Sequence, residues 1–275
     1  MTVRLNKNRL VVLLAATLSA NAAMAASPVG NASAWDLAVH VNLIGLAQLD
    51  VGAQTSATLT NVLASASDSQ TLPSAAFSSP LNLITLSTGV LASDAEYVGG
   101  NGMSAIAARS SVDDLALGAG ASVLSLNAGV VTSTSSLAGI CPDPVHAKAE
   151  SMLNDFVFFS TFDTGNLVSG GGGGGDGGGL GGLPPGGGTL VDPVVSILGI
   201  PVPGLPLNPA PNTNVDLAAL GIVGATLILN EQTTTGDGVH SLANATNAIH
   251  LTLNVAQLVT ADVIVAHSEV SLACP

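Results

Sequence analysis

The sequence predicts an all-β fold, either an antiparallel β-sandwich or an elongated β roll, with one long disordered loop rich in glycine and proline. Three observations predict it. Apolar and polar residues alternate in several stretches, most clearly over residues 249–255 and 266–272. Ser, Thr, Val and Gly dominate where helix formers would be needed. A glycine tract at 169–188 and a proline-rich run at 193–211 interrupt the strand patterns and predict the loop.

The first 25 residues have the pattern of a secretory signal peptide. Arg4, Lys7 and Arg9 precede an apolar run over residues 10–18, and Ala23-Met24-Ala25 supplies the small-x-small cleavage pattern. The run is well short of the ~20 residues that a membrane-spanning helix needs. We expect the mature chain to be secreted (extracellular, cell-surface or periplasmic) with no membrane span. An uncleaved signal acting as a tether is the alternative.

Composition limits the partners of the mature chain. Of the 275 residues of the full sequence, 47% are hydrophobic but only 3% are aromatic, so we expect a thin core of small side chains. After signal removal, Arg109 and Lys148 are the only fixed cations against 18 acidic residues, a balance of 2 − 18 = −16. Nucleic acid and anionic membranes are therefore excluded as partners. An unidentified extracellular or cell-envelope partner is expected.

The strand patterns form two blocks around the insertion. Residues 26–164 are the first part of the β domain, 165–211 the flexible insertion, and 212–275 the second part. The strand over 33–53 carries Trp35, expected to pack at a sheet edge, and His40, expected to face solvent. Segments 86–93, 126–133 and 253–260 resemble one another, which makes a β-solenoid the alternative architecture.

Cys141 and Cys274 are the only cysteines, and each is followed by proline. An even pair in an exported chain predicts a disulfide. It would close a loop of 274 − 141 = 133 residues, a constraint that contributes ~4 kcal/mol in the chain-entropy model. Two unpaired thiols are the alternative.

Motifs for catalysis are absent from the sequence, and we assign no catalytic, cofactor-binding or metal-binding residue. His250, His267 and Glu269 lie on neighbouring predicted strands and could form an acid-base or metal cluster, although outward polar residues meet in this way by chance. Residues 171–176 match the start of a glycine-rich calcium repeat, but in a single copy.

Five segments resemble the bacterial "choice-of-anchor P" proteins. They are Ser33-Ala34-Trp35-Asp36-Leu37, Pro211-Asn212-Thr213-Asn214-Val215-Asp216-Leu217, residues 224–233 with Leu229-Asn230-Glu231-Gln232, Asn247-Ala248-Ile249-His250-Leu251, and Ala266-His267-Ser268-Glu269-Val270. The resemblance implies an exported bacterial β domain, and it carries over no catalytic residue. The chain departs from the family in its Gly/Pro insertion and in lacking a sorting tail, from which we expect release rather than anchoring.

The function expected from these observations is that of a secreted or cell-surface, non-enzymatic β protein with a structural or adhesive role and no cofactor. Two alternatives stay open. One is a hydrolase of extracellular polymers that uses carboxylates such as Glu231 and Glu269. The other is a calcium-stabilised module, suggested by the surplus of acidic residues.

Overall fold

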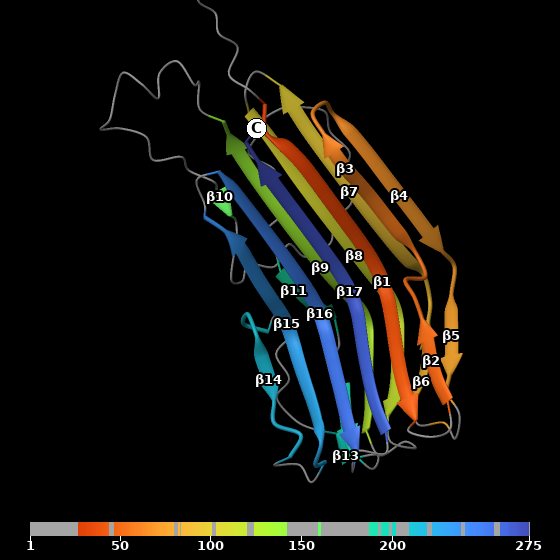
Figure 1. Cartoon of the computed structure of the whole chain (residues 1–275). Helices are drawn as coiled ribbons and strands as arrows, with labels where there is room; N and C mark the ends of the chain where they lie inside the picture. Colours follow the sequence, from red (N-terminus) through yellow and green to blue (C-terminus); the bar gives the residue numbers. More distant parts are fainter. Residues whose placement is uncertain are drawn as a thin grey trace, which may run out of the picture.

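The computed structural model in Figure 1 consists of strands and the turns between them. It describes residues 27–43, 47–79, 82, 84–100, 103–119, 124–141, 159–160, 187–191, 194–197, 200–201, 209–218, 222–237, 240–255 and 259–274. The predicted signal peptide and most of the predicted insertion lie outside these ranges. Among the described residues, no helix has the length and apolar character needed to span a bilayer.

The described strands form two sheets. Sheet A has seven strands: β14 (Thr213–Val215), β15 (Ala225–Gly236), β16 (Ser241–Val255), β17 (Val259–Ala273), β1 (Val29–Leu43) and β2 (Ala47–Val51) in that order, with β3 (Ser56–Val62) also paired to β1. Sheet B has ten: β4 (Ala66–Leu72), β5 (Ala75–Ser78), β6 (Ile84–Thr88), β7 (Leu91–Gly100), β8 (Met103–Ala119), β9 (Leu124–Ile140), β10 (Phe159–Ser160), β11 (Gly187–Val191), β12 (Val194–Ile197) and β13 (Ile200–Pro201).

All strand pairings in the described ranges are antiparallel, which confirms the predicted all-β antiparallel fold. The β-solenoid alternative is wrong for these strands, because a parallel β-solenoid stacks its strands in parallel. Of the segments that resemble one another, 86–93 spans the turn from β6 to β7, whereas 126–133 lies inside β9. These two segments are therefore not structural equivalents.

Both blocks of the sequence contribute to sheet A. β1 from the first block pairs along its length with β17 from the second, from Val29 opposite Ala273 to Leu43 opposite Val259. Three short strands, β11 to β13, fall inside the predicted flexible insertion; β11 and β12 pair with β9, and β13 pairs with β12.

On four neighbouring strands of sheet A, the alternation of inward and outward side chains is interrupted where two consecutive residues both point inward. These interruptions lie along one line across the sheet. On β1, Ala34 and Asp36 point inward, and then the adjacent Leu37 also points inward, followed by Val39. The same reversal occurs at Ala248 on β16 and Ala266 on β17, next to buried Ile249 and Val265. Asn230 on β15 completes the line. We call these four positions, Asn230, Ala248, Ala266 and Asp36, the reversal line.

Left-handed backbone conformations accompany the reversal line. Asn230 has φ 52° and Ala266 has φ 55°. Asparagine tolerates this region, but for alanine it is a steric cost. The register is otherwise unbroken, with Leu229 opposite Ile249 and Glu231 opposite Asn247. Because neighbouring strands reverse together, the apolar side chains on both sides of the line still face sheet B.

Two apolar clusters fill the space between the sheets, one on each side of the reversal line. The larger contains Leu37, Val39, and Leu251 and Leu253 of β16. The smaller is rich in alanine, including Ala32, Ala34 and Ala57. Alanine makes up five of the twelve buried residues of the smaller cluster but five of 25 in the larger, so the smaller cluster buries less apolar area per residue.

The disulfide closes the end of the sandwich that holds the smaller cluster. Cys141 follows β9 of sheet B and Cys274 follows β17 of sheet A; the two are bonded, with their Cα atoms 5.4 Å apart. In Figure 1 the label C marks this end, beside the tip of β9. The predicted pairing is confirmed, and it joins the two sheets covalently.

Tyr97 fixes the start of β1 at this same end. Its hydroxyl donates to the carbonyl of Pro28 at 2.6 Å and lies 2.7 Å from the Ser104 hydroxyl. Its ring covers Gly30, where an added Cβ would lie 2.7 Å from two ring carbons and 2.9 Å from Cδ1 of Ile106. Any side chain at position 30 must displace this ring.

We therefore expect Gly30→Ala to lower the free energy of unfolding by about 1–3 kcal/mol, the usual cost of overpacking a core. Gly52→Ala is the matched control, because a Cβ there meets nothing within 4 Å. Urea unfolding of both variants measures the difference. Equal stability of the two variants would contradict the packing described for Tyr97.

Candidate functional site: the outer face of sheet A

A row of large side chains crosses the outer face of sheet A beside the reversal line. Trp35 on β1 is opposite His267 on β17, His267 is opposite Asn247 on β16, and Asn247 is opposite Glu231 on β15. Antiparallel pairing places such residues side by side on one face. Trp35 lies on an interior strand, paired on both sides, so the expectation that it packs at a sheet edge is wrong.

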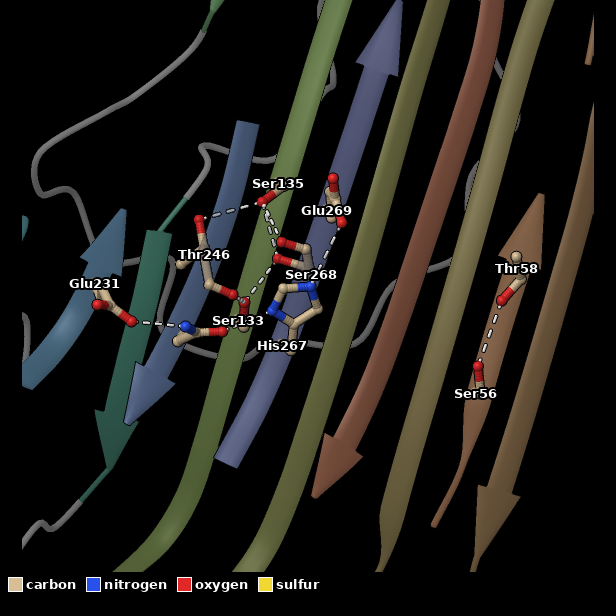
Figure 2. Close-up of polar contacts among 10 residues, drawn as sticks. Ser56, Thr58, Ser133, Ser135, Glu231, Thr246, His267, Ser268 and Glu269 are labelled. Atoms are coloured by element: carbon tan, nitrogen blue, oxygen red, sulfur yellow. Dashed lines mark hydrogen bonds and ion pairs between the residues drawn. The ribbon is translucent and has the colours of Figure 1, made fainter. Parts of the chain in front are cut away.

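Direct contacts connect this row, which we call the Trp35 row. The rings of Trp35 and His267 are stacked, with centroids 4.5 Å apart and an interplanar angle of 19°. His267 Nδ1 lies 2.6 Å from Asn247 Oδ1, and Asn247 Nδ2 donates to Glu231 Oε2 at 2.7 Å. Figure 2 shows Glu231 and His267 on separate strands, with Glu269 beside His267.

His250 extends the network toward Asp262. Its Nδ1 is 2.8 Å from Glu231 Oε2, and its Nε2 is 2.9 Å from Asp262 Oδ1. His250 and Asn247 are three residues apart on β16, a spacing that would put them on opposite faces of a regular strand. The reversal at Ala248 brings both to the outer face, where Glu231 contacts each of them.

The predicted cluster of His250, His267 and Glu269 is only partly assembled. All three lie on the outer face of sheet A, but His267 Nε2 is 3.9 Å from Glu269 Oε2, beyond hydrogen-bond distance, and the Glu269 side chain is 55% exposed. His250 bonds to Glu231 and Asp262 instead. No group of three or more His, Cys, Asp or Glu side chains within the described ranges is arranged to hold a metal ion.

The cluster of His250, His267 and Glu269 lies outside the open pocket found on the described part of sheet A. This pocket of about 270 Å³ lies where β1, β2, β16 and β17 meet, and it includes His40 and Asp262 but not Glu231, His267 or Glu269. His40 is exposed, as the sequence predicted, and pairs with Asp50 at 2.7 Å. The Trp35 row therefore lies on the outer face of the sheet and outside this pocket, a position that suits binding an extended ligand better than enclosing a small one.

Burial controls the charge of His267. Loss of hydration lowers the pKa of His267 from 6.5 to about 4, although the nearby Glu231 carboxylate acts in the opposite direction. His267 is thus neutral at physiological pH. A neutral ring stacked on Trp35 does not quench the indole as an imidazolium does.

The protonation state of His267 can be followed by tryptophan fluorescence, since Trp35 is the only tryptophan in the sequence. Acidification should reduce the emission of Trp35 as the pH passes about 4, rather than near 6.5. His267→Gln should remove the transition, whereas His240→Gln, at a histidine with an 80% exposed side chain, should leave it in place. A transition near 6.5 in the unmodified chain would show that burial does not control this histidine.

A second polar network, which the sequence analysis did not anticipate, lies between the sheets. Asp36 is fully buried and accepts from Ser110 Oγ at 2.7 Å and Ser93 Oγ at 3.0 Å, and also from the Thr55 hydroxyl. Desolvation raises the pKa of Asp36 to about 6, even though the bonds from Ser110 and Ser93 favour the ionised form and lower it. The sequence gives no signal for this network, because Trp35, Asp36 and Leu37 alternate as apolar, polar and apolar, a pattern that predicts an outward-facing Asp36.

The buried network continues toward β16. Ser133 Oγ donates to the carbonyl of Thr246 at 2.8 Å and lies 2.6 Å from Ser268 Oγ, and Ser135 Oγ donates to the carbonyl of Ser268 at 3.0 Å. Figure 2 shows these side chains meeting between β9 and the strands of sheet A. Buried hydroxyls that satisfy one another fix how the two sheets pack. The network is structural, because it is closed off from solvent.

No protein-family model matches the chain, and a search of curated proteins finds no match to it. The described fold defines its class: an antiparallel β-sandwich with a disulfide between the sheets and a polar, aromatic-bearing outer face.

Proposed function

We propose that this protein is an exported, non-enzymatic β-sandwich of the choice-of-anchor P type, with a structural or adhesive role outside the cytoplasm. The observation that carries the proposal is the Trp35 row on the outer face of sheet A, an aromatic pair followed by hydrogen-bonding side chains in register across four strands. Such a surface can bind a ligand without surrounding it. The family assignment rests on the sequence resemblance described above.

The bonding of the histidines supports a role other than catalysis. Both ring nitrogens of His250 are engaged, by Glu231 and by Asp262. His267 contacts Asn247 through Nδ1 and is neutral at physiological pH because its pKa is lowered to about 4. A general acid or base must reach a proton of the substrate, and these groups are directed at one another instead.

The disulfide supports the proposed location. Disulfides persist in oxidising compartments outside the cytoplasm and are rare within it. The bond between Cys141 and Cys274 joins the two sheets, so it belongs to the folded structure. Together with the signal-peptide pattern, it favours an extracellular, cell-surface or periplasmic location.

Binding of the exported chain to intact cells, immobilised glycans and matrix polymers tests the proposal, with hydrolysis of the same polymers assayed in parallel. We expect retention on at least one surface without release of soluble products. Hydrolysis that disappears in the Glu231→Gln/Glu269→Gln variant would instead establish the hydrolase alternative. A melting temperature that rises with calcium and falls again with chelator would support the calcium-stabilised alternative.

A further inference from the structure

Trp35 has one indole face that its aromatic neighbour does not cover. The rings of Trp35 and His267 are nearly parallel and 4.5 Å apart, close to the ~4.8 Å between adjacent strands. Their planes therefore stand upright on the sheet and face along the direction from strand to strand. His267 on β17 covers one face of the indole, and the other faces β3, on the opposite side of β1.

Small hydroxyl side chains lie on that second side. Ser56 of β3 is paired with Trp35, and Thr58 is paired with Ser33. A serine side chain is too short to cover an indole face, and Trp35 is half-buried rather than buried. We call the part of the surface bordered by Trp35, Ser56 and Thr58 the slot. Figure 2 shows these two hydroxyls, whose oxygens lie 3.4 Å apart. Thr58 is exposed and Ser56 is partly exposed.

The backbone at this edge is closed to an added strand. The amide N–H of Ser56 donates to Gln70 Oε1 at 3.3 Å, and that of Thr58 donates to Asp68 Oδ2 at 2.8 Å. Side chains of β4 thus occupy the donors that an incoming peptide strand would need. A ligand in the slot must therefore bind through the indole face and the side-chain hydroxyls.

The charges around the slot select the class of ligand. Glu269 and Glu231 lie on the same outer face, and Arg109, the one lysine or arginine in the described ranges, lies on sheet B. This face repels polyanions. Carboxylates and hydroxyls accept hydrogen bonds from sugar hydroxyls, while an aromatic face packs against the C–H surface of a pyranose ring.

We infer that the slot between Trp35 and β3 binds one pyranose ring of a neutral polysaccharide, which continues across the outer face of sheet A toward Glu269. This inference rests on the proposed adhesive role and names its ligand. The neighbouring row holds small side chains at Ser33, Ala245 and Thr233, so the polymer can lie flat beside the Trp35 row.

The test uses the full chain, exported so that its disulfide forms, and the single tryptophan as reporter. Cellulose, starch, β-1,3-glucan and mannan are the insoluble probes, and their soluble hexasaccharides are titrated against the emission of Trp35. Ser56→Tyr fills the slot and leaves Trp35 in place. Ser69→Tyr makes the same change at an exposed position on β4 and is the matched control.

We expect binding to at least one neutral probe, with a change in Trp35 emission. Ser56→Tyr should weaken it by about tenfold, equivalent to about 1.4 kcal/mol, and Ser69→Tyr should leave it unchanged. Three results overturn the inference: no neutral probe binds, Ser56→Tyr binds as well as the unmodified chain, or only polygalacturonate or polylysine is retained. Cell binding that survives Ser56→Tyr rejects this ligand while leaving the proposed adhesive role intact.

Discussion

Replacing Cys141 and Cys274 by alanine should lower the free energy of unfolding by about 4 kcal/mol, the largest effect expected from removing one bond in this chain. The bond restrains an unfolded chain over 133 residues. It also joins β9 to β17 at the end of the sandwich that holds the smaller apolar cluster, in which five of the twelve buried residues are alanine.

Guanidinium unfolding of the double variant, beside the unmodified chain with and without reductant, measures this effect. The reduced unmodified chain should match the double variant, and reductant should leave the double variant unchanged. Hydrogen exchange should rise first in β1, near Val29, because that residue lies next to the disulfide through its pairing with Ala273. Equal midpoints of guanidinium unfolding for the oxidised and reduced chains would contradict a stabilising role of the disulfide.

Replacing Asp36 by asparagine should stabilise the protein at neutral pH and have little effect near pH 4. Burial raises the pKa of Asp36 from 3.8 to about 6. Between these values the folded chain keeps a proton that the unfolded chain has lost, so stability falls as the pH rises through this window. The shift corresponds to about 3 kcal/mol by the usual conversion. Asparagine removes the charge and still accepts from Ser93 or Ser110.

The measurement is the free energy of unfolding of both chains across pH 4 to 8, compared at each pH. His267 acts in the opposite direction, because its lowered pKa makes stability fall as the pH drops from 6.5 toward 4. Subtracting the free energies of unfolding of the two chains at the same pH cancels the contribution of His267, because both chains contain it.

Two further variants, one at position 50 and one at position 36, separate the effect of the buried Asp36 charge from the effect of its hydrogen bonds. Asp50→Asn changes an exposed carboxylate and should alter stability little at any pH. Asp36→Ala leaves the hydroxyls of Thr55, Ser93 and Ser110 without their acceptor and should destabilise the fold throughout. A difference between Asp36→Asn and the unmodified chain that does not vary with pH would refute the assignment of a buried, titrating carboxylate.

The alternation of apolar and polar residues predicted the strands, because one face of each sheet is buried. This signal is local in the sequence. Ile249, Leu251 and Leu253 are buried and His250 points outward, as the sequence predicted. The reversal line was not predictable. The apolar-polar alternation continues through Trp35, Asp36 and Leu37, and the two adjacent apolar residues Ala248 and Ile249 look the same as an irregular strand. Its cause is the matching reversal in the neighbouring strands, which depends on pairing between residues more than 200 positions apart.

The candidate site was predictable in its members but not in its arrangement. Glu231, His250, His267 and Glu269 were singled out from strand patterns, and all of them lie on sheet A. Which of them touch depends on the register. His250 bonds to Glu231 and Asp262 rather than to Glu269. Trp35 joins the site because β1 and β17 are partners, a long-range pairing that the local pattern does not specify.

The position of the disulfide determines the products of proteolysis. Cys141 directly follows β9, and Cys274 directly follows β17, the last strand. A single cut after Cys141 and before β17 produces two polypeptides that remain covalently linked, each supplying strands to sheet A. Such a nicked molecule would migrate as one species without reductant and as two with it, so a cut there need not release either half.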